Sequence, residues 1–117
     1  MNEENKISMT RGDTARWKFQ RLDANGNPIT SIADYCWFTV KTNDMKKETI
    51  LQKTIDDMEF GEDYFYRFTI EPEDTNNLQY GDYVYDLEVI QEDYKQTISK
   101  GVFTLEYEVT FVNNEVK

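Results

Sequence analysis

The feature that most constrains the fold is an alternation of apolar and polar residues with a period of two. In the two clearest segments the apolar members are Ala15, Trp17 and Phe19, and then Cys36, Phe38 and Val40. A period of two places such residues on one face of a β-strand, whereas an amphipathic helix needs a period of about 3.6. These segments are therefore predicted to be strands that each bury one face.

Further segments repeat the alternation, with turn residues between them. Ile7 to Met9 is an edge segment, and Thr49 to Ile55 is a weaker strand. Three later strands have their own inward apolar series: Tyr64, Tyr66, Phe68 and Ile70; Tyr83, Tyr85, Leu87 and Val89; and Ile98, Phe103 and Leu105, with Val109 and Phe111 after a bend. Turn signals recur roughly every ten residues, which is typical of a β-sandwich. We predict an all-β, Greek-key, immunoglobulin-like sandwich of about seven antiparallel strands. It forms one domain over residues 1–117, with a core at about 6–112.

Three local features refine this prediction. Gly101 interrupts the final strand and predicts a β-bulge there. The stretch from Asn43 to Glu48 is interpreted as a loop, with a single helical turn capped by Asn43 as the alternative. Trp37 has the opposite parity to Cys36, so either Trp37 lies under a loop or the inward face of its strand is the other one.

A tyrosine corner is predicted where Leu78, Gly81 and Tyr83 form a Leu-x-x-Gly-x-Tyr segment. In Greek-key sandwiches, a Tyr at the start of a late strand donates its hydroxyl to backbone a few residues upstream. Tyr83 is the candidate for this role. Gly81 would allow the tight turn, and Leu78 would fill the core beside it.

The inventory of reactive side chains argues against an enzyme. The chain has no histidine and one cysteine, so the commonest general base and the thiolate metal sites are missing. Cys36 is predicted to be a small buried hydrophobic residue. Acidic pairs such as Asp56-Asp57 are interpreted as loop charges. No catalytic, cofactor-binding or metal-binding residue is therefore predicted, and no cofactor.

The net charge limits the partners. Twenty-three acidic residues against thirteen basic ones give a formal charge of −10. Such a surface repels the phosphates of nucleic acids and the anionic headgroups of membranes. Neither is expected as a partner, and the ordinary role of the acidic surplus is solubility.

Two short motifs are interpreted as turns. Arg11-Gly12-Asp13 spells a cell-adhesion tripeptide, but it joins the edge segment to the strand that starts near Thr14. Asp23-x-Asn25-x-Asn27 resembles the start of a calcium loop. Its sixth position, which needs glycine for the sharp bend, is Pro28, and its twelfth is Asp34 instead of glutamate. A hairpin turn is predicted there.

Several phrases taken in order resemble one known family. They are Arg11-Gly12-Asp13-Thr14; Asp23-Ala24-Asn25-Gly26-Asn27-Pro28-Ile29; Cys36-Trp37-Phe38-Thr39-Val40-Lys41; Ile70-Glu71-Pro72-Glu73-Asp74-Thr75-Asn76-Asn77-Leu78; Gly81-Asp82-Tyr83-Val84-Tyr85-Asp86-Leu87; and Gly101-Val102-Phe103-Thr104-Leu105, ending in Val109-Thr110. From about Ile7 to Thr110, the chain resembles the immunoglobulin-like N-terminal domain of phage baseplate upper proteins and related small prophage proteins of Gram-positive bacteria. The resemblance implies an all-β adaptor with no catalytic residues.

The resemblance implies a structural or assembly role in a phage or prophage tail or baseplate, through protein–protein contacts. Other tail or baseplate proteins are the expected partners, with a homo-oligomer as a further option, and the expected location is the virion, assembled in the host cytoplasm. The Ile7–Met9 edge and the last strand beyond Leu105 are the first contact surfaces to consider. The alternative is a carbohydrate-binding or cell-surface immunoglobulin-like module, for which Trp37, Phe65 and Tyr94 are the outward-facing aromatic residues.

Overall fold

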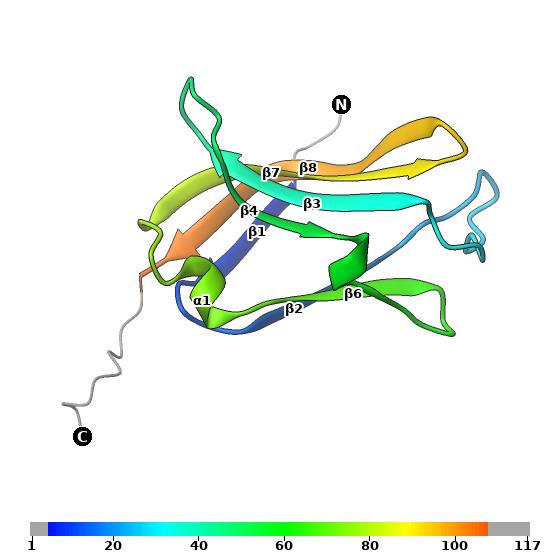
Figure 1. Cartoon of the computed structure of the whole chain (residues 1–117), viewed down its shortest axis with the longest axis horizontal. Helices are drawn as coiled ribbons and strands as arrows, with labels where there is room; N and C mark the ends of the chain where they lie inside the picture. Colours follow the sequence, from blue (N-terminus) through cyan, green and yellow to red (C-terminus); the bar gives the residue numbers. More distant parts are fainter. Residues whose placement is uncertain (1–4, 108–117) are drawn as a thin grey trace.

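In the computed structural model, which describes residues 5–107, two β-sheets pack face to face (Figure 1). In spatial order, the five-stranded sheet contains β1 (Asn5–Thr10), β8 (Tyr94–Glu106), β7 (Gly81–Gln91), β3 (Tyr35–Thr42) and β4 (Thr49–Thr54). The three-stranded sheet contains β2 (Ala15–Gln20), β6 (Phe65–Ile70) and β5 (Glu59–Phe60). Two short helices, η1 (Ile55–Asp57) and α1 (Pro72–Thr75), lie in the connections.

The strand order is that of an immunoglobulin-like β-sandwich. Successive strands β2 and β3 lie in different sheets, and so do β6 and β7, while β7 and β8 form a hairpin. Crossing between sheets in this way gives the Greek-key connections of the fold. The predicted fold class is therefore confirmed.

Two details differ from the prediction of about seven antiparallel strands. The described residues form eight strands, because the two-residue strand β5 is too short to show a sequence period. In addition, β1 and β8 pair in parallel, from Asn5 opposite Gly101 to Thr10 opposite Glu106. Strands so far apart in the chain are not joined by a hairpin, so no connection forces them to be antiparallel.

The main core cluster is centred on Phe38, which is 2% exposed. Its ring centroid lies 4.9 Å from that of Phe68 in the opposite sheet. Tyr85 and Phe103, from its own sheet, have ring centroids 5.7 and 6.3 Å away. Tilted aromatic contacts of this kind add to the stabilisation that comes from burying the ring area. Phe38 therefore links the inner faces of both sheets.

A second buried cluster closes the other end of the sandwich and contains Ala33, Cys36, Tyr66 and Val89. The Tyr66 hydroxyl accepts a hydrogen bond from the backbone N–H of Ala33 (3.0 Å), and its ring stacks on Phe19 (centroids 4.7 Å apart). Burial raises the pKa of the Cys36 thiol to about 11, with Arg21 acting in the opposite direction. Cys36 is thus the buried hydrophobic residue that was predicted, because a thiol at this pKa forms little of the reactive thiolate.

The predicted alternation agrees with the inward faces of the strands except at Tyr64, which lies in the turn before β6 with φ +67°. The predicted position of the β-bulge is also wrong. The β7–β8 pairing shifts register between Leu87 and Glu88, whose partners are Ser99 and Thr97. The extra, unpaired residue of the β-bulge is therefore Ile98, whereas Gly101 pairs regularly with Tyr85. Residues 43–48 form a loop of turns and bends, as interpreted from the sequence. Val109 and Phe111 lie outside the described residues.

Candidate functional site

The predicted tyrosine-corner residues lie at the start of β7. The Tyr83 hydroxyl donates a hydrogen bond to the backbone carbonyl of Gln79 (2.7 Å), four residues upstream. Gly81 has a backbone φ of +133°, which residues other than glycine rarely adopt. Leu78 is half-buried against the main core cluster. This hydrogen bond fixes the entry of the chain into β7.

The same segment also holds the turn that carries Arg11-Gly12-Asp13. The Arg11 guanidinium donates to the carbonyl of Leu78 (3.1 Å) and lies 4.3 Å from the ring centre of Tyr80. The backbone N–H of Gly12 donates to the hydroxyl of Thr75 (2.9 Å), a fully buried residue. The tripeptide therefore has a structural role, because its hydrogen bonds hold the β1–β2 turn against the segment between β6 and β7.

Replacing Tyr83 with Phe removes only the hydroxyl that bonds to Gln79. We expect the free energy of unfolding, measured by urea denaturation, to fall by about 1 kcal/mol, the net value of one intramolecular hydrogen bond. Tyr80→Phe is the matched control, since no hydrogen bond from the Tyr80 hydroxyl is found in the described part of the chain. Equal stability of the two variants would show that the Tyr83 hydrogen bond contributes nothing.

The segment that resembles a calcium loop is a turn closed by its own aspartate. The Asp23 carboxylate accepts hydrogen bonds from the backbone N–H groups of Asn25 and Asn27 (both 2.9 Å). This is the local pairing by which Asp stabilises turns. Within residues 5–107, no group of three or more His, Cys, Asp or Glu side chains is arranged to hold a metal ion.

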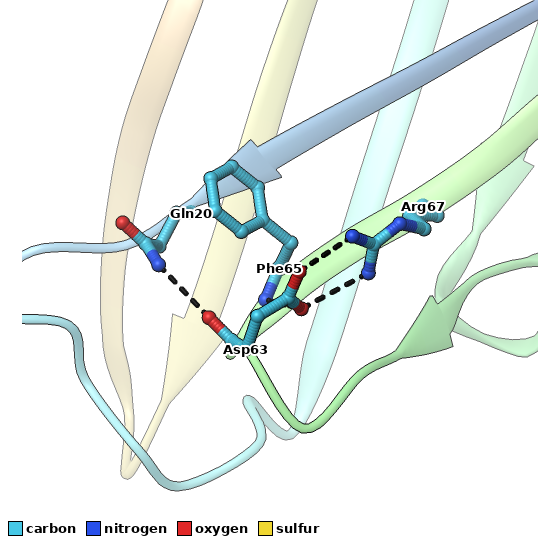
Figure 2. A network of polar contacts seen from close by, with 4 residues as sticks. All are labelled: Gln20, Asp63, Phe65 and Arg67. Atoms are coloured by element: carbon cyan, nitrogen blue, oxygen red, sulfur yellow. Dashed lines mark hydrogen bonds and ion pairs between the residues drawn. The ribbon is translucent and has the colours of Figure 1, made fainter.

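The outer face of the three-stranded sheet carries a charged network, shown in Figure 2. Arg67 donates two hydrogen bonds to the Asp63 carboxylate (2.6 and 3.0 Å), and these hold the pKa of Asp63 well below its usual range. The Lys18 ammonium lies 4.6 Å from the centre of the Phe65 ring, and the Arg67 guanidinium lies 5.7 Å from it. Two cations therefore lie against Phe65, one of the three outward aromatic residues named from the sequence.

A hollow of about 720 Å³ with charged walls is lined mainly by residues of the three-stranded sheet, together with Lys53 of β4 and Asp57 of η1. Its cations include Arg67, paired with Asp63, and Lys53, whose ammonium lies 2.8 Å from the Asp74 carboxylate. Asp57, Glu59 and Glu71 also line it. Since much of this charge is already balanced within the protein, the hollow is a weaker candidate for a site than its volume indicates.

The outer face of the five-stranded sheet offers a different arrangement. We use the name "outer groove" for the hollow of about 470 Å³ lined by Trp37, Thr39, Lys41, Thr49, Gln52, Asp86, Glu88, Ile90 and Lys95. Register brings these residues together, because Trp37 lies opposite Glu88 on β7, and Thr39 lies opposite Asp86. In Figure 1, this face lies on the side of the sheet away from β2 and β6.

Trp37 is a half-buried wall of the outer groove. Its ring stacks on Tyr35, with centroids 5.7 Å apart and planes 13° from parallel, and Tyr35 itself is 56% exposed. The parity question raised by the sequence is thus resolved: Cys36, Phe38 and Val40 face the core, and Trp37 belongs to the outer face. Tyr94, the third aromatic residue, is 69% exposed at the β7–β8 hairpin.

Asp86 is a half-buried carboxylate in this groove, and the structure stabilises its charge poorly. Burial and the neighbouring Glu88 raise its pKa, and together they outweigh Lys41, Lys95 and Lys100, which lower it. No hydrogen bond or ion pair to the Asp86 side chain is found among the described residues. Lys95 instead pairs with Glu88 (3.4 Å). The ionised Asp86 side chain therefore lowers the stability of the folded protein.

We expect Asp86→Asn to raise the thermal unfolding midpoint at pH 7. A carboxyl whose folded-state pKa is raised destabilises the native state when ionised, and this effect disappears as pH falls below about 4. The midpoint is measured at pH 7 and again at acidic pH, where the advantage should vanish. Glu62→Gln, at an exposed loop position, controls for the loss of one negative charge from a chain of net charge −10. A lower midpoint than that of Glu62→Gln at pH 7 would contradict the argument.

The lining of the outer groove is chemically mixed. It offers an aromatic ring, two carboxylates, two ammonium groups, an amide and hydroxyls, without a nucleophile held by a base. Trp37 was named from the sequence as an outward aromatic residue, and the inward series Tyr85, Leu87 and Val89 implies outward positions for Asp86 and Glu88. The sequence missed Tyr35, whose spacing of two from Trp37 was the available signal, and it missed Lys95 of β8.

The chain matches no protein-family model and no curated protein. Among solved structures, it is similar to CopC from Methylosinus trichosporium OB3b, with a TM-score of 0.49 and 12% sequence identity over 95% of this chain and 91% of CopC. It is also similar to Tim-1, with a TM-score of 0.36 and 10% identity over 97% of this chain and 100% of Tim-1. Likenesses this distant carry no functional argument, and the fold is assigned from strand order and register. Within residues 5–107, no helix is long and apolar enough to span a membrane.

Proposed function

We propose that this protein is a non-enzymatic structural module of a phage or prophage tail or baseplate, which acts through protein–protein contacts in the virion. The order of family-like phrases from Ile7 to Thr110, in a chain with the fold that the resemblance implies, carries this proposal. The phrases fall on structurally distinct parts: the β1–β2 turn, the β3 core strand and the β7 corner. The expected partners are other tail or baseplate proteins.

The strand edges supply contact surfaces that suit such a role. In the described residues, β1 and β4 are the two edges of the five-stranded sheet, and β2 is an edge of the smaller one. Edge strands present backbone N–H and C=O groups that can pair with another chain. The segment Ile7–Met9 lies within β1, so the contact surface expected from the sequence is an edge. β8 ends at Glu106, and residues 108–117 lie outside the described residues.

The acidic surface is compatible with assembly that occurs only when a specific partner is present. A net charge of −10 disfavours contact between free copies, and a specific partner surface can overcome this repulsion. Interfaces of this kind work by shape, backbone pairing and buried side chains and need no reactive group. The missing histidine and the buried Cys36 are in keeping with this mode of action.

Quantitative mass spectrometry of purified particles tests the proposal. Particles are induced from the source strain and separated on a density gradient, and isotope-labelled peptides of this chain and of the major tail protein are used as standards. We expect this chain at a constant ratio to the tail protein across the particle peak. A strain lacking the gene controls for contamination. If the chain stays in the free lysate and the peak contains none, the structural role is wrong.

A further inference from the structure

The indole of Trp37 is held as a wall of the outer groove. Its stacking on Tyr35 restricts the ring, and the other groove residues come from β3, β4, β7 and β8, which position them rigidly. No hydrogen bond from the Trp37 N–H is found within the described residues, and this N–H is not buried. An aromatic face combined with an available N–H suits a ligand that is apolar on one side and polar at its rim.

The polar groups of the groove lie on the strand next to Trp37. Glu88 is directly opposite Trp37 on β7, and Asp86 is two residues before it, on the same face. On the other side of β3, the amide of Gln52 donates to the hydroxyl of Thr39 (2.9 Å), which leaves the Gln52 carbonyl oxygen as a further acceptor. The groove thus presents mainly hydrogen-bond acceptors, with the lysine ammonium groups as donors at its margins.

Asp86 is the strongest indication that the outer groove binds a ligand. A half-buried carboxylate without a hydrogen bond leaves a strong acceptor unused, and donors from a ligand would supply charge-assisted bonds. Its raised pKa agrees with this, since the protein alone does not stabilise the charge. Groups kept at a cost in stability are commonly found at functional sites.

Charge distinguishes between classes of ligand. Within the groove, Asp86 and Glu88 are matched in number by Lys41 and Lys95, so the lining has no net charge. A net charge of −10 over the whole chain repels anionic ligands. An uncharged ligand rich in hydroxyl groups avoids this repulsion and satisfies the carboxylates. The groove volume of about 470 Å³ lies within the range of about 300–1,000 Å³ typical of small-ligand sites.

We propose that the outer groove binds an uncharged saccharide, with one pyranose ring against the indole of Trp37 and its hydroxyl groups donating to Asp86 and Glu88. The slightly positive C–H face of a pyranose complements the negative face of an aromatic ring. The hollow of about 720 Å³ is less suitable, because its Arg67 and Lys53 are already paired with Asp63 and Asp74. This inference does not depend on the proposed role in a phage particle.

The test is a titration of the full chain, followed by tryptophan fluorescence and by saturation-transfer NMR. The probes are trisaccharides of glucose, galactose and N-acetylglucosamine, with trigalacturonic acid as the anionic comparison. We expect at least one uncharged probe to bind at millimolar concentration or below, and trigalacturonic acid to bind at least about tenfold more weakly.

Variants locate the site. Trp37→Ala should weaken binding at least about tenfold, and Trp37→Phe, which retains a smaller ring, should weaken it less. Asp86→Asn should weaken binding several-fold while the protein remains at least as stable as wild type, which separates a lost contact from unfolding. Phe65→Ala is the matched aromatic control on the opposite sheet and should bind like wild type.

Three results would overturn the inference. The first is that no uncharged probe binds at millimolar concentration. The second is that Trp37→Ala binds as well as Phe65→Ala. The third is that sedimentation equilibrium shows a dimer that Trp37→Ala dissociates, which would assign this face to a second copy of the chain. Each result concerns the groove alone, so the mass-spectrometric test of the structural role stands separately.

Discussion

The contact between Phe38 and Phe68 joins the two sheets, and the rest of the structure depends on it. Phe38 lies on β3, which pairs with β4 on one side and β7 on the other. Its ring also meets Tyr85 of β7 and Phe103 of β8. Three strands of the larger sheet therefore share one aromatic cluster with the smaller sheet. Burial of apolar surface is the dominant favourable term in folding, and large rings contribute much of it per residue.

The outward surface follows from the same strand. Because side chains alternate across a β-strand, an inward Phe38 requires an outward Trp37 and an outward Thr39. The cross-strand partners on β7 alternate in step, which brings Glu88 and Asp86 beside them. The core and the outer groove are thus two faces of one sheet. A substitution on the outer face can change binding while the contacts that hold the fold remain in place.

Much of the fold could be predicted because alternation reports burial directly. The inward residues of β3, such as Phe38 and Val40, and those of β7, such as Tyr85, were identified from the sequence. The parallel pairing of β1 and β8 could not be predicted, since it joins segments about a chain length apart and leaves no local signal. The bulge at Ile98 was misplaced to Gly101 because a glycine in a strand marks either a bulge or a regular position beside a large neighbour, here Tyr85.

The candidate site was only partly visible in the sequence. Parity placed Trp37, Asp86 and Glu88 outward, but the stacking of Tyr35 and the unpaired state of Asp86 depend on side-chain geometry. The corner formed by Tyr83 could be predicted because its residues are close in sequence and one hydrogen bond defines it. The biological role rests on family-like phrases whose partners lie in other chains, and no residue pattern within this chain specifies those partners.

The most direct test of this account is the stability of Phe38→Ala. Removing a buried aromatic ring from a core typically costs about 3–5 kcal/mol. We therefore predict that the urea midpoint falls sharply and that both sheets unfold together in one transition. Tyr94→Ala, at a position 69% exposed, should change stability by less than about 0.5 kcal/mol. If Phe38→Ala were as stable as Tyr94→Ala, or if the smaller sheet unfolded separately, Phe38 would not be the residue that holds the sandwich together.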